Sequence, residues 1–109
     1  MDGKTTIKYL QNYIKSKDYY PELKHQYFLK LVEEVGELAR AMHKDLPANS
    51  ADDIKETINE EIWDIIYYAL ALANCYNIDV EQVISRKEAI NNQKYNNKII
   101  FEENRWIPV

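Results

Sequence analysis

The sequence predicts an all-α protein folded as a four-helix bundle, with a short N-terminal helix, three longer helices and an extended C-terminal tail. The chain of 109 residues contains only two glycines and three prolines, which are too few for the many tight turns of an all-β fold. Apolar residues recur at intervals of three and four along most of the chain, which is the period of one helix face. The breaks between these segments are short, and short connections favour antiparallel neighbours.

The first two helices are predicted from their apolar stripes and from two prolines. Residues 5–16 carry isoleucine and leucine on one face. Pro21 suits the first turn of the second helix, because its ring presets φ and its missing N–H is not needed there. That helix should end before Pro47, because the residue preceding a proline is displaced from the α region. Its apolar positions are Phe28, Leu31, Val32, Val35, Leu38, Ala39 and Met42.

The third and fourth helices have candidate caps in front of them. Ser50 and Asp53 resemble a capping pair for the third helix. Residues 62–76 are apolar on nearly every side, which is typical of a central, buried helix. Asp79 and Gln82 form a second capping pair, and we expect the fourth helix to start there.

Size, charge and cysteine content restrict the class of protein. We expect one domain over residues 1–109, with the fourth helix ending near Tyr95 and residues 96–109 as the tail. A formal net charge of −4 argues against nucleic acid or an acidic membrane as partner, because both attract clustered lysine and arginine. No apolar run reaches the length of a membrane span. Cys75 is the single cysteine, which suits a reducing cytoplasm.

Pairs of carboxylates on the second and third helices predict a metal site. Glu34 and Glu37 lie one turn apart beside the apolar stripe, with Glu33 flanking them, and Glu61 and Asp64 repeat this spacing. Asp64 lies in the most apolar stretch, where a lone carboxylate costs several kcal/mol or becomes protonated. A positive group should therefore face it. Mg²⁺ prefers oxygen ligands, and the absence of histidine and cysteine from the set disfavours Zn²⁺.

The same acids are also compatible with purely structural roles. Acidic pairs at helical spacing are common on solvated surfaces, which applies to Glu33 and is our preferred interpretation of Glu60. A salt bridge to a buried lysine would also account for Asp64. Gly36 costs the helix roughly 1 kcal/mol against alanine, so we expect a neighbouring helix or a ligand to approach it closely.

The inner face of the fourth helix changes from apolar to basic and amide. Its apolar stripe continues at the same spacing into Lys87, Asn91 and Lys94. Because Lys87 and Asn91 lie mid-helix on the buried line, we favour a functional role for both. Lysines near a helix end also stabilise the helix dipole, which accounts for Lys94 equally well. On the second helix, Lys30 stands four residues before Glu34, either beside the site or as a simple ion-pair partner.

Charge arithmetic connects these groups. Four carboxylates carry about −4 and an ionised triphosphate carries about −4, so the two would repel. Two or three divalent ions would supply about +4 to +6, and lysines the remainder. The set is therefore suited to a polyphosphate that carries metal ions.

These residues carry a family resemblance. The pattern Glu33-Glu34-x-x-Glu37, Glu61-x-x-Asp64 and Lys87-x-x-x-Asn91 resembles the MazG-like branch of the all-α nucleoside triphosphate pyrophosphohydrolases, over roughly residues 25–95. The resemblance implies a Mg²⁺-dependent hydrolase, with Mn²⁺ as a substitute ion. It would convert ribo- or deoxyribonucleoside triphosphates to monophosphates and pyrophosphate, with clearance of non-canonical nucleotides as the expected role.

The resemblance also implies roles for individual residues. The implied metal ligands are Glu34, Glu37, Glu61 and Asp64, and Glu33 would orient or deprotonate the attacking water, which makes Glu33 and Glu34 the catalytic pair. The implied substrate contacts are Lys87, Asn91 and Lys94 toward the phosphates, Tyr68 toward the sugar or base, and Lys30. A buried tyrosine with a satisfied hydroxyl accounts for Tyr68 equally well.

Members of this family are usually dimers or tetramers, so we expect a homodimer or homotetramer. The tail contains apolar residues over 98–101 and 106–108, which a small monomer would cover poorly, and exposed patches of this kind mark interfaces. We expect the tail to pack on a partner subunit.

Two classes of rival function remain. A dUTPase-like or phosphoribosyl-ATP pyrophosphohydrolase activity would use the same scaffold. A non-catalytic helical interaction module would have the acids as a solvated surface, and divalent ions would then leave its stability unchanged.

Overall fold

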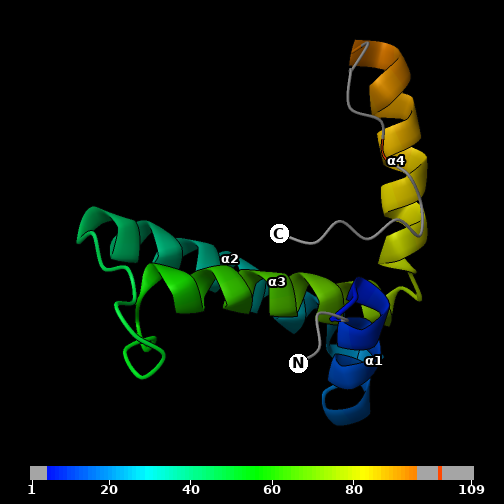
Figure 1. Ribbon diagram of the computed structural model, residues 1–109. Helices are drawn as coiled ribbons and strands as arrows, with labels where there is room; N and C mark the ends of the chain where they lie inside the picture. The colour runs from blue at the N-terminus through cyan, green and yellow to red at the C-terminus, as the bar shows by residue number, and fades with distance from the viewer. Residues whose placement is uncertain (1–4, 96–100, 102–109) are drawn as a thin grey trace.

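The computed structural model describes residues 5–95 and residue 101. In this part of the chain all regular structure is helical (Figure 1), which confirms the predicted all-α class. The elements are α1 (Ile7–Lys17), a 3₁₀ turn η1 (Pro21–Leu23), α2 (Lys24–His43), α3 (Ile58–Cys75) and α4 (Val80–Tyr95). Among the described residues, no helix combines the length and apolarity needed to cross a membrane. The predicted tail lies outside the described residues except for Phe101, which is exposed, so its packing on a partner stays a prediction.

Helices α2 and α3 lie side by side and antiparallel, and make the most extensive contact between any two described elements (Figure 1). One stripe of α2, spaced by four and three residues, is less exposed than the rest of the helix. Within it Tyr27 and Ala41 are buried, and Leu31 and Leu38 are half-buried. Glu34 belongs to the same stripe, so the helical repeat that buries these residues also carries a carboxylate to the contact with α3.

Helix α1 packs against α3 and completes the small core. Ile14 is fully buried and clusters with Tyr27, Leu70 and Ala71. One turn earlier Gln11, which is also buried, faces the same way. The single chain thus has a short core at one end of the α2–α3 pair, as expected for a domain of this size.

The cap of α3 differs from the predicted one. The Thr57 side chain accepts a hydrogen bond from the Glu60 N–H at 3.4 Å, and the Glu60 carboxylate accepts one from the Glu56 N–H at 3.1 Å. Ser50 and Asp53 instead belong to a turn in which the Asp53 N–H donates to the Ser50 carbonyl at 3.2 Å. The predicted Ser50 cap is therefore wrong. Both pairs fit the capping pattern, but only Thr57 directly precedes the apolar run.

The other helix boundaries are close to the predicted ones. Pro21 opens the 3₁₀ turn that leads into α2, and α2 ends at His43, before Pro47. The cap of α4 is confirmed, because the Asp79 carboxylate accepts hydrogen bonds from the N–H groups of Glu81 and Gln82 at 3.1 and 3.4 Å.

Helix α4 stands away from the α2–α3 pair and contacts α1 (Figure 1). Its first turn is held by Lys8, whose ammonium group lies 2.7 Å from the Asp79 carboxylate and whose N–H donates to Glu81 at 2.8 Å. Further along, Lys87 and Asn91 replace apolar residues on the inner line, so α4 has little apolar surface to bury against the pair. The antiparallel arrangement expected of neighbouring helices therefore holds for α2 and α3 but not for α4 within one chain.

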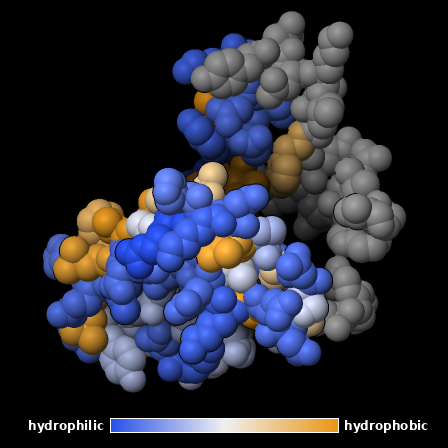
Figure 2. Space-filling view, turned by 90° about the vertical axis from the view of Figure 1, so that its left-hand side faces the viewer, coloured by the Kyte–Doolittle hydropathy of each residue, from blue (hydrophilic) through white to orange (hydrophobic). Residues whose placement is uncertain are grey.

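A second face of α2 is apolar and exposed. Phe28, Val32 and Val35 are each 51% exposed, and Met42 is 61% exposed; we call these four the α2 apolar stripe. Figure 2 shows further apolar patches at the end where α2 and α3 are joined. A Cβ added to Gly36 would meet nothing within 4 Å, so the close approach expected there is not made by any described residue of the same chain.

Candidate metal centre

Three carboxylates from α2 and α3 converge between the two helices. One oxygen each from Glu34, Glu61 and Asp64 lie within 4.8 Å of one another; we call these residues the acidic triad. Glu34 comes from the stripe of α2 that faces α3, and Glu61 and Asp64 lie one turn apart on α3. The helical spacing that predicted the pairs is therefore also what brings them together.

Glu61 is the least solvated member of the triad. It is 5% exposed, and its Oε2 atom is buried without a hydrogen-bond partner among the described residues. Burial, followed by the neighbouring Glu34 and Asp64 carboxyl groups, raises the pKa of Glu61 to about 7. An ionised, buried carboxylate with an unused oxygen needs a positive partner.

Asp64 shares this environment. Burial, followed by the charge of Glu34 and then that of Glu60, raises the pKa of the Asp64 carboxyl group. No salt bridge connects Asp64 to a lysine or arginine in the part of the chain that the structure describes. The buried-lysine interpretation of Asp64 is therefore not supported.

The donor set fits a divalent cation with a preference for oxygen. Three ionised carboxylates this close together repel one another, and a shared cation between them lowers the free energy of the ionised set. Mg²⁺ typically uses a few carboxylates together with water and phosphate oxygens. The unused Glu61 oxygen is an available ligand in this arrangement.

Glu37 lies next to the triad but is not part of it. It stands one turn after Glu34 and pairs with Arg40, whose guanidinium group lies 3.3 Å from the Glu37 carboxylate. Glu37, Arg40 and Glu61 together line a pocket of about 130 Å³. The structure thus brings together three of the four implied metal ligands and places the fourth beside them.

Glu33 and Glu60 have other surroundings. The Glu33 side chain is more than half exposed, and its carboxylate lies 3.6 Å from the Lys30 ammonium group. Lys30 and Glu33 are spaced i, i+3 on α2, so Lys30 forms an ion pair within its own helix, as one of the two interpretations of this residue expected. Its partner is Glu33 and not Glu34. Glu60 caps α3, as its bond to the Glu56 N–H shows.

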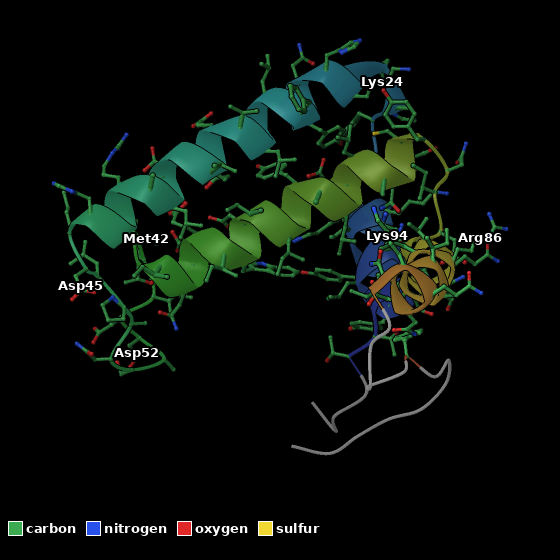
Figure 3. All side chains as sticks on the ribbon, turned by 90° about the horizontal axis from the view of Figure 1, so that it is seen from above. Lys24, Met42, Asp45, Asp52, Arg86 and Lys94 are labelled. Atoms are coloured by element: carbon green, nitrogen blue, oxygen red, sulfur yellow. The ribbon has the colours of Figure 1, made fainter. Side chains whose placement is uncertain are left out.

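The residues predicted on α4 lie away from the triad in the single chain. Lys87 and Lys94 are exposed, and the Asn91 side chain donates to the Glu88 carboxylate at 2.8 Å. Figure 3, which shows α4 end-on, places Arg86 and Lys94 with that helix, beyond the side of the α2–α3 pair. The described residues of one chain therefore do not bring these side chains to the carboxylates.

A larger pocket of about 280 Å³ lies at the opposite end of the triad from Glu37. Tyr68 and Lys30, both predicted substrate contacts, line it and lie one turn from Asp64 and Glu34 respectively. We call it the tyrosine pocket, and its lining residues are Asp18, Tyr20, Leu23, Gln26, Tyr27, Lys30 and Tyr68.

Asp18 and Gln26 of the tyrosine pocket were not anticipated from the sequence. The Asp18 carboxylate accepts hydrogen bonds from the hydroxyl groups of Tyr27 at 2.7 Å and Tyr67 at 2.8 Å. Because these three residues come from the end of α1, from α2 and from α3, no local spacing indicates their contact. The abundance of tyrosine was the only available signal, and it has no characteristic period.

A comparison with family models identifies a matching domain family. Residues 23–98 match the MazG nucleotide pyrophosphohydrolase domain. This range covers most of the chain, including the triad, the α2 apolar stripe and all of α4. A comparison with curated protein sequences gives no match.

Solved structures from one source are similar over most of the chain. The crystal structure of Ctag-iMazG from Vibrio DAT 722 is 38% identical with a TM-score of 0.77, and covers 81% of this chain and 99% of its own. Ntag-iMazG from the same source is 39% identical with a TM-score of 0.78, and covers 85% of this chain and 100% of its own. The similarity therefore extends over both sequence and fold.

Proposed function

The chain belongs to the MazG nucleotide pyrophosphohydrolase domain family, and from this premise we propose that it is a Mg²⁺-dependent nucleoside triphosphate pyrophosphohydrolase. The proposed reaction converts ribo- or deoxyribonucleoside triphosphates to monophosphates and pyrophosphate, with Mn²⁺ as a substitute ion. The observation that carries the proposal is the buried Glu61 carboxylate, which has an unused oxygen beside two further carboxylates. Clearance of non-canonical nucleotides in a reducing cytoplasm is the role we propose for it.

The proposed metal ligands are the acidic triad together with Glu37. When bound, Mg²⁺ would supply the positive charge that four carboxylates and a triphosphate together lack. Glu37 would have to exchange its contact with Arg40 for the ion, and it already shares a pocket with Glu61. Arg40 would then be released beside the site as a further positive charge.

The remaining assignments concern water and substrate. We assign Glu33, whose carboxylate is on the solvent side of α2, to orient and deprotonate the attacking water. Lys30 would leave Glu33 for a phosphate oxygen, since the two groups lie at 3.6 Å and are both about half exposed. Tyr68 would contact the nucleoside from one turn beyond Asp64.

We further propose that the active form is a homodimer or homotetramer. Among the described residues the α2 apolar stripe is exposed, and exposed apolar surface of this kind marks an interface. Lys87, Asn91 and Lys94 would then act on the triad of a second copy, because α4 does not reach the triad of its own chain.

The oligomer has a direct test. Val35→Asp should yield a monomer by light scattering, with loss of activity, whereas the exposed His25→Asp on α2 should keep both the oligomer and the activity. A wild-type protein that is monomeric and fully active would contradict this part of the proposal.

The function is tested by a panel of triphosphates with separate detection of pyrophosphate and orthophosphate. The panel should include the canonical nucleotides, dUTP, phosphoribosyl-ATP and oxidised or deaminated nucleotides, each with Mg²⁺, with Mn²⁺ and with EDTA. We expect pyrophosphate release that requires the ion. Turnover confined to dUTP or phosphoribosyl-ATP would favour the rival activities, and no turnover together with no effect of Mg²⁺ on melting would favour a non-catalytic module.

A further inference from the structure

The tyrosine pocket lies within reach of a substrate whose phosphates are at the acidic triad. Lys30 stands one turn before Glu34 and Tyr68 one turn after Asp64, and one helical turn is about 5.4 Å. Burial raises the pKa of Tyr68, and the charges that act on it are those of Lys30, Glu34, Asp18 and Asp64. Tyr68, which lines the pocket, therefore also lies close enough to Glu34 and Asp64 for their charges to act on its hydroxyl group.

The pocket is suited to an uncharged ring rather than to phosphate. The negative charge of Asp18 offsets the positive charge of Lys30, so the pocket offers phosphate oxygens no net positive charge, and Tyr20, Leu23 and Tyr27 contribute aromatic and aliphatic surface. Its volume of about 280 Å³ is near the lower limit of small-molecule sites, about 300 Å³. Such a space suits one flat ring system, not a whole nucleotide.

Some hydrogen-bonding groups of the pocket already have partners within the protein, and others are available to a ligand. Both oxygens of Asp18 already accept hydrogen bonds, from Tyr27 and Tyr67. The Gln26 amide and the Tyr68 hydroxyl make no hydrogen bond with any described residue. Both can donate and accept, and a glutamine amide can turn over to exchange its donor and acceptor.

We propose that the tyrosine pocket takes the nucleobase of the substrate and that Gln26 determines which bases are accepted, an inference that rests on the proposed function. Adenine and cytosine present an exocyclic amino donor, whereas guanine and thymine present an exocyclic oxygen acceptor. A freely turning amide at Gln26 satisfies either edge. The wild-type protein therefore discriminates weakly between the two groups of bases.

Two substitutions remove this freedom in opposite directions. Gln26→Glu leaves only acceptors, so kcat/KM for dATP and dCTP should rise about tenfold relative to dGTP and dTTP. Gln26→Lys leaves only donors, so the same ratio should fall about tenfold. Because a new charge near a triphosphate changes all four rates together, the ratio within each variant is the measurement.

The matched controls are His25→Glu and His25→Lys, which place the same charges on the neighbouring exposed position of α2 without lining the pocket. They should leave the ratio unchanged. Gln26→Ala removes both donor and acceptor, so it should lower kcat/KM for all four substrates and leave their order of preference unchanged. All variants should keep the wild-type melting temperature, because residues 25 and 26 are exposed.

The outcomes are distinguishable. If the wild-type protein releases pyrophosphate but neither charged variant at residue 26 shifts the ratio, or both shift it in the same direction, the assignment of Gln26 is wrong and the proposed function stands. If the wild-type protein hydrolyses none of the four substrates but does hydrolyse the oxidised or deaminated nucleotides of the panel, the inference is overturned and the proposed function stands. If it hydrolyses no triphosphate of the panel, both are overturned.

Discussion

Gln11 and Asn74 join α1 to α3 by exchanging hydrogen bonds in the buried core. The Gln11 amide donates to the Asn74 side-chain oxygen at 3.0 Å, and the Asn74 amide donates to the Gln11 carbonyl at 3.0 Å. Gln11 also donates to the Ile78 carbonyl and accepts from the Val80 N–H, at 2.8 and 3.1 Å. This pair therefore positions α1, the end of α3 and the start of α4 together.

Asn74→Leu should destabilise the protein by about 2–4 kcal/mol, because the buried Gln11 amide loses one of its two acceptors and the Gln11 backbone carbonyl loses the Asn74 donor. For a domain of this size the melting temperature should fall by roughly 10–20 °C. The exposed Asn12→Leu, next to Gln11 on α1, is the control and should change stability little. Equal melting temperatures for the two variants would show that the buried exchange contributes nothing.

The capping of α3 gives a second prediction. Thr57→Ala should cost about 1 kcal/mol, because the Thr57 side chain accepts the Glu60 N–H. Ser50→Ala, at the cap that the sequence had suggested, should be neutral. Urea unfolding of the two variants measures the difference, and a larger loss at Ser50 would contradict the observed start of α3.

Alkaline pH should loosen the contact between α1, α2 and α3. Burial, followed by the hydrogen bond to Asp18, raises the pKa of both Tyr27 and Tyr67. The fold therefore favours the neutral phenols over the ionised ones. Their contribution to the free energy of unfolding is complete below about pH 10, which is the pKa of tyrosine in the unfolded chain. It is lost as the pH rises above that value. Tyrosine absorbance at 295 nm, followed with circular dichroism, should show these phenols ionising only as the protein unfolds.

A control separates these two phenols from the others. Tyr9 is exposed on α1, and Tyr9→Phe should leave the alkaline unfolding midpoint unchanged. Asp18→Ala should lower the stability at neutral pH, because both hydroxyl groups lose their acceptor. An alkaline midpoint shared by wild type and Asp18→Ala would exclude a role for the Asp18 contacts.

The acidic triad predicts a stability that depends on pH when no metal is present. The pKa of Glu61 is raised from 4.5 to about 7, so the fold favours its protonated form. The contribution of Glu61 to the free energy of unfolding is complete below about pH 4.5 and is lost as the pH rises through 7. Each unit of difference between the folded and unfolded pKa corresponds to about 1.4 kcal/mol. In EDTA the melting temperature should therefore fall between pH 5 and pH 8, and Glu61→Gln should reduce that fall.

The metal itself gives the last prediction. Asp64→Asn should abolish Mg²⁺-dependent pyrophosphate release while the fold is kept, because a neutral amide is a poorer ligand. Saturating Mg²⁺, at 100 times its dissociation constant, should stabilise the wild-type protein by about 2.7 kcal/mol, and this gain should disappear in the variant. The exposed Asp52→Asn in the α2–α3 loop should retain both activity and stabilisation; full turnover by Asp64→Asn would refute the site.

Much of the fold was predictable because the relevant forces are local. The period of the apolar residues predicts α2 and α3, and the spacing of Glu34, Glu61 and Asp64 on those helices predicts their convergence. The error at Ser50 has a physical basis, since two capping patterns precede one apolar run and sequence spacing alone does not rank them. The exchange between Gln11 and Asn74 was missed because its partners are 63 residues apart.

The sequence by itself determined the helical class, the family and the pairs of acids. Helical periodicity places residues that are three or four apart on a common face, whatever the position of the helix in the fold. Only the tertiary structure decided that α4 stands apart from Glu34 and that Asp18, which lines the tyrosine pocket, accepts hydrogen bonds from Tyr27 and Tyr67. These contacts depend on the relative placement of whole helices. That placement follows from which apolar surfaces are buried against each other. It is therefore a property of pairs of helices, and the spacing of residues within a single helix does not determine it.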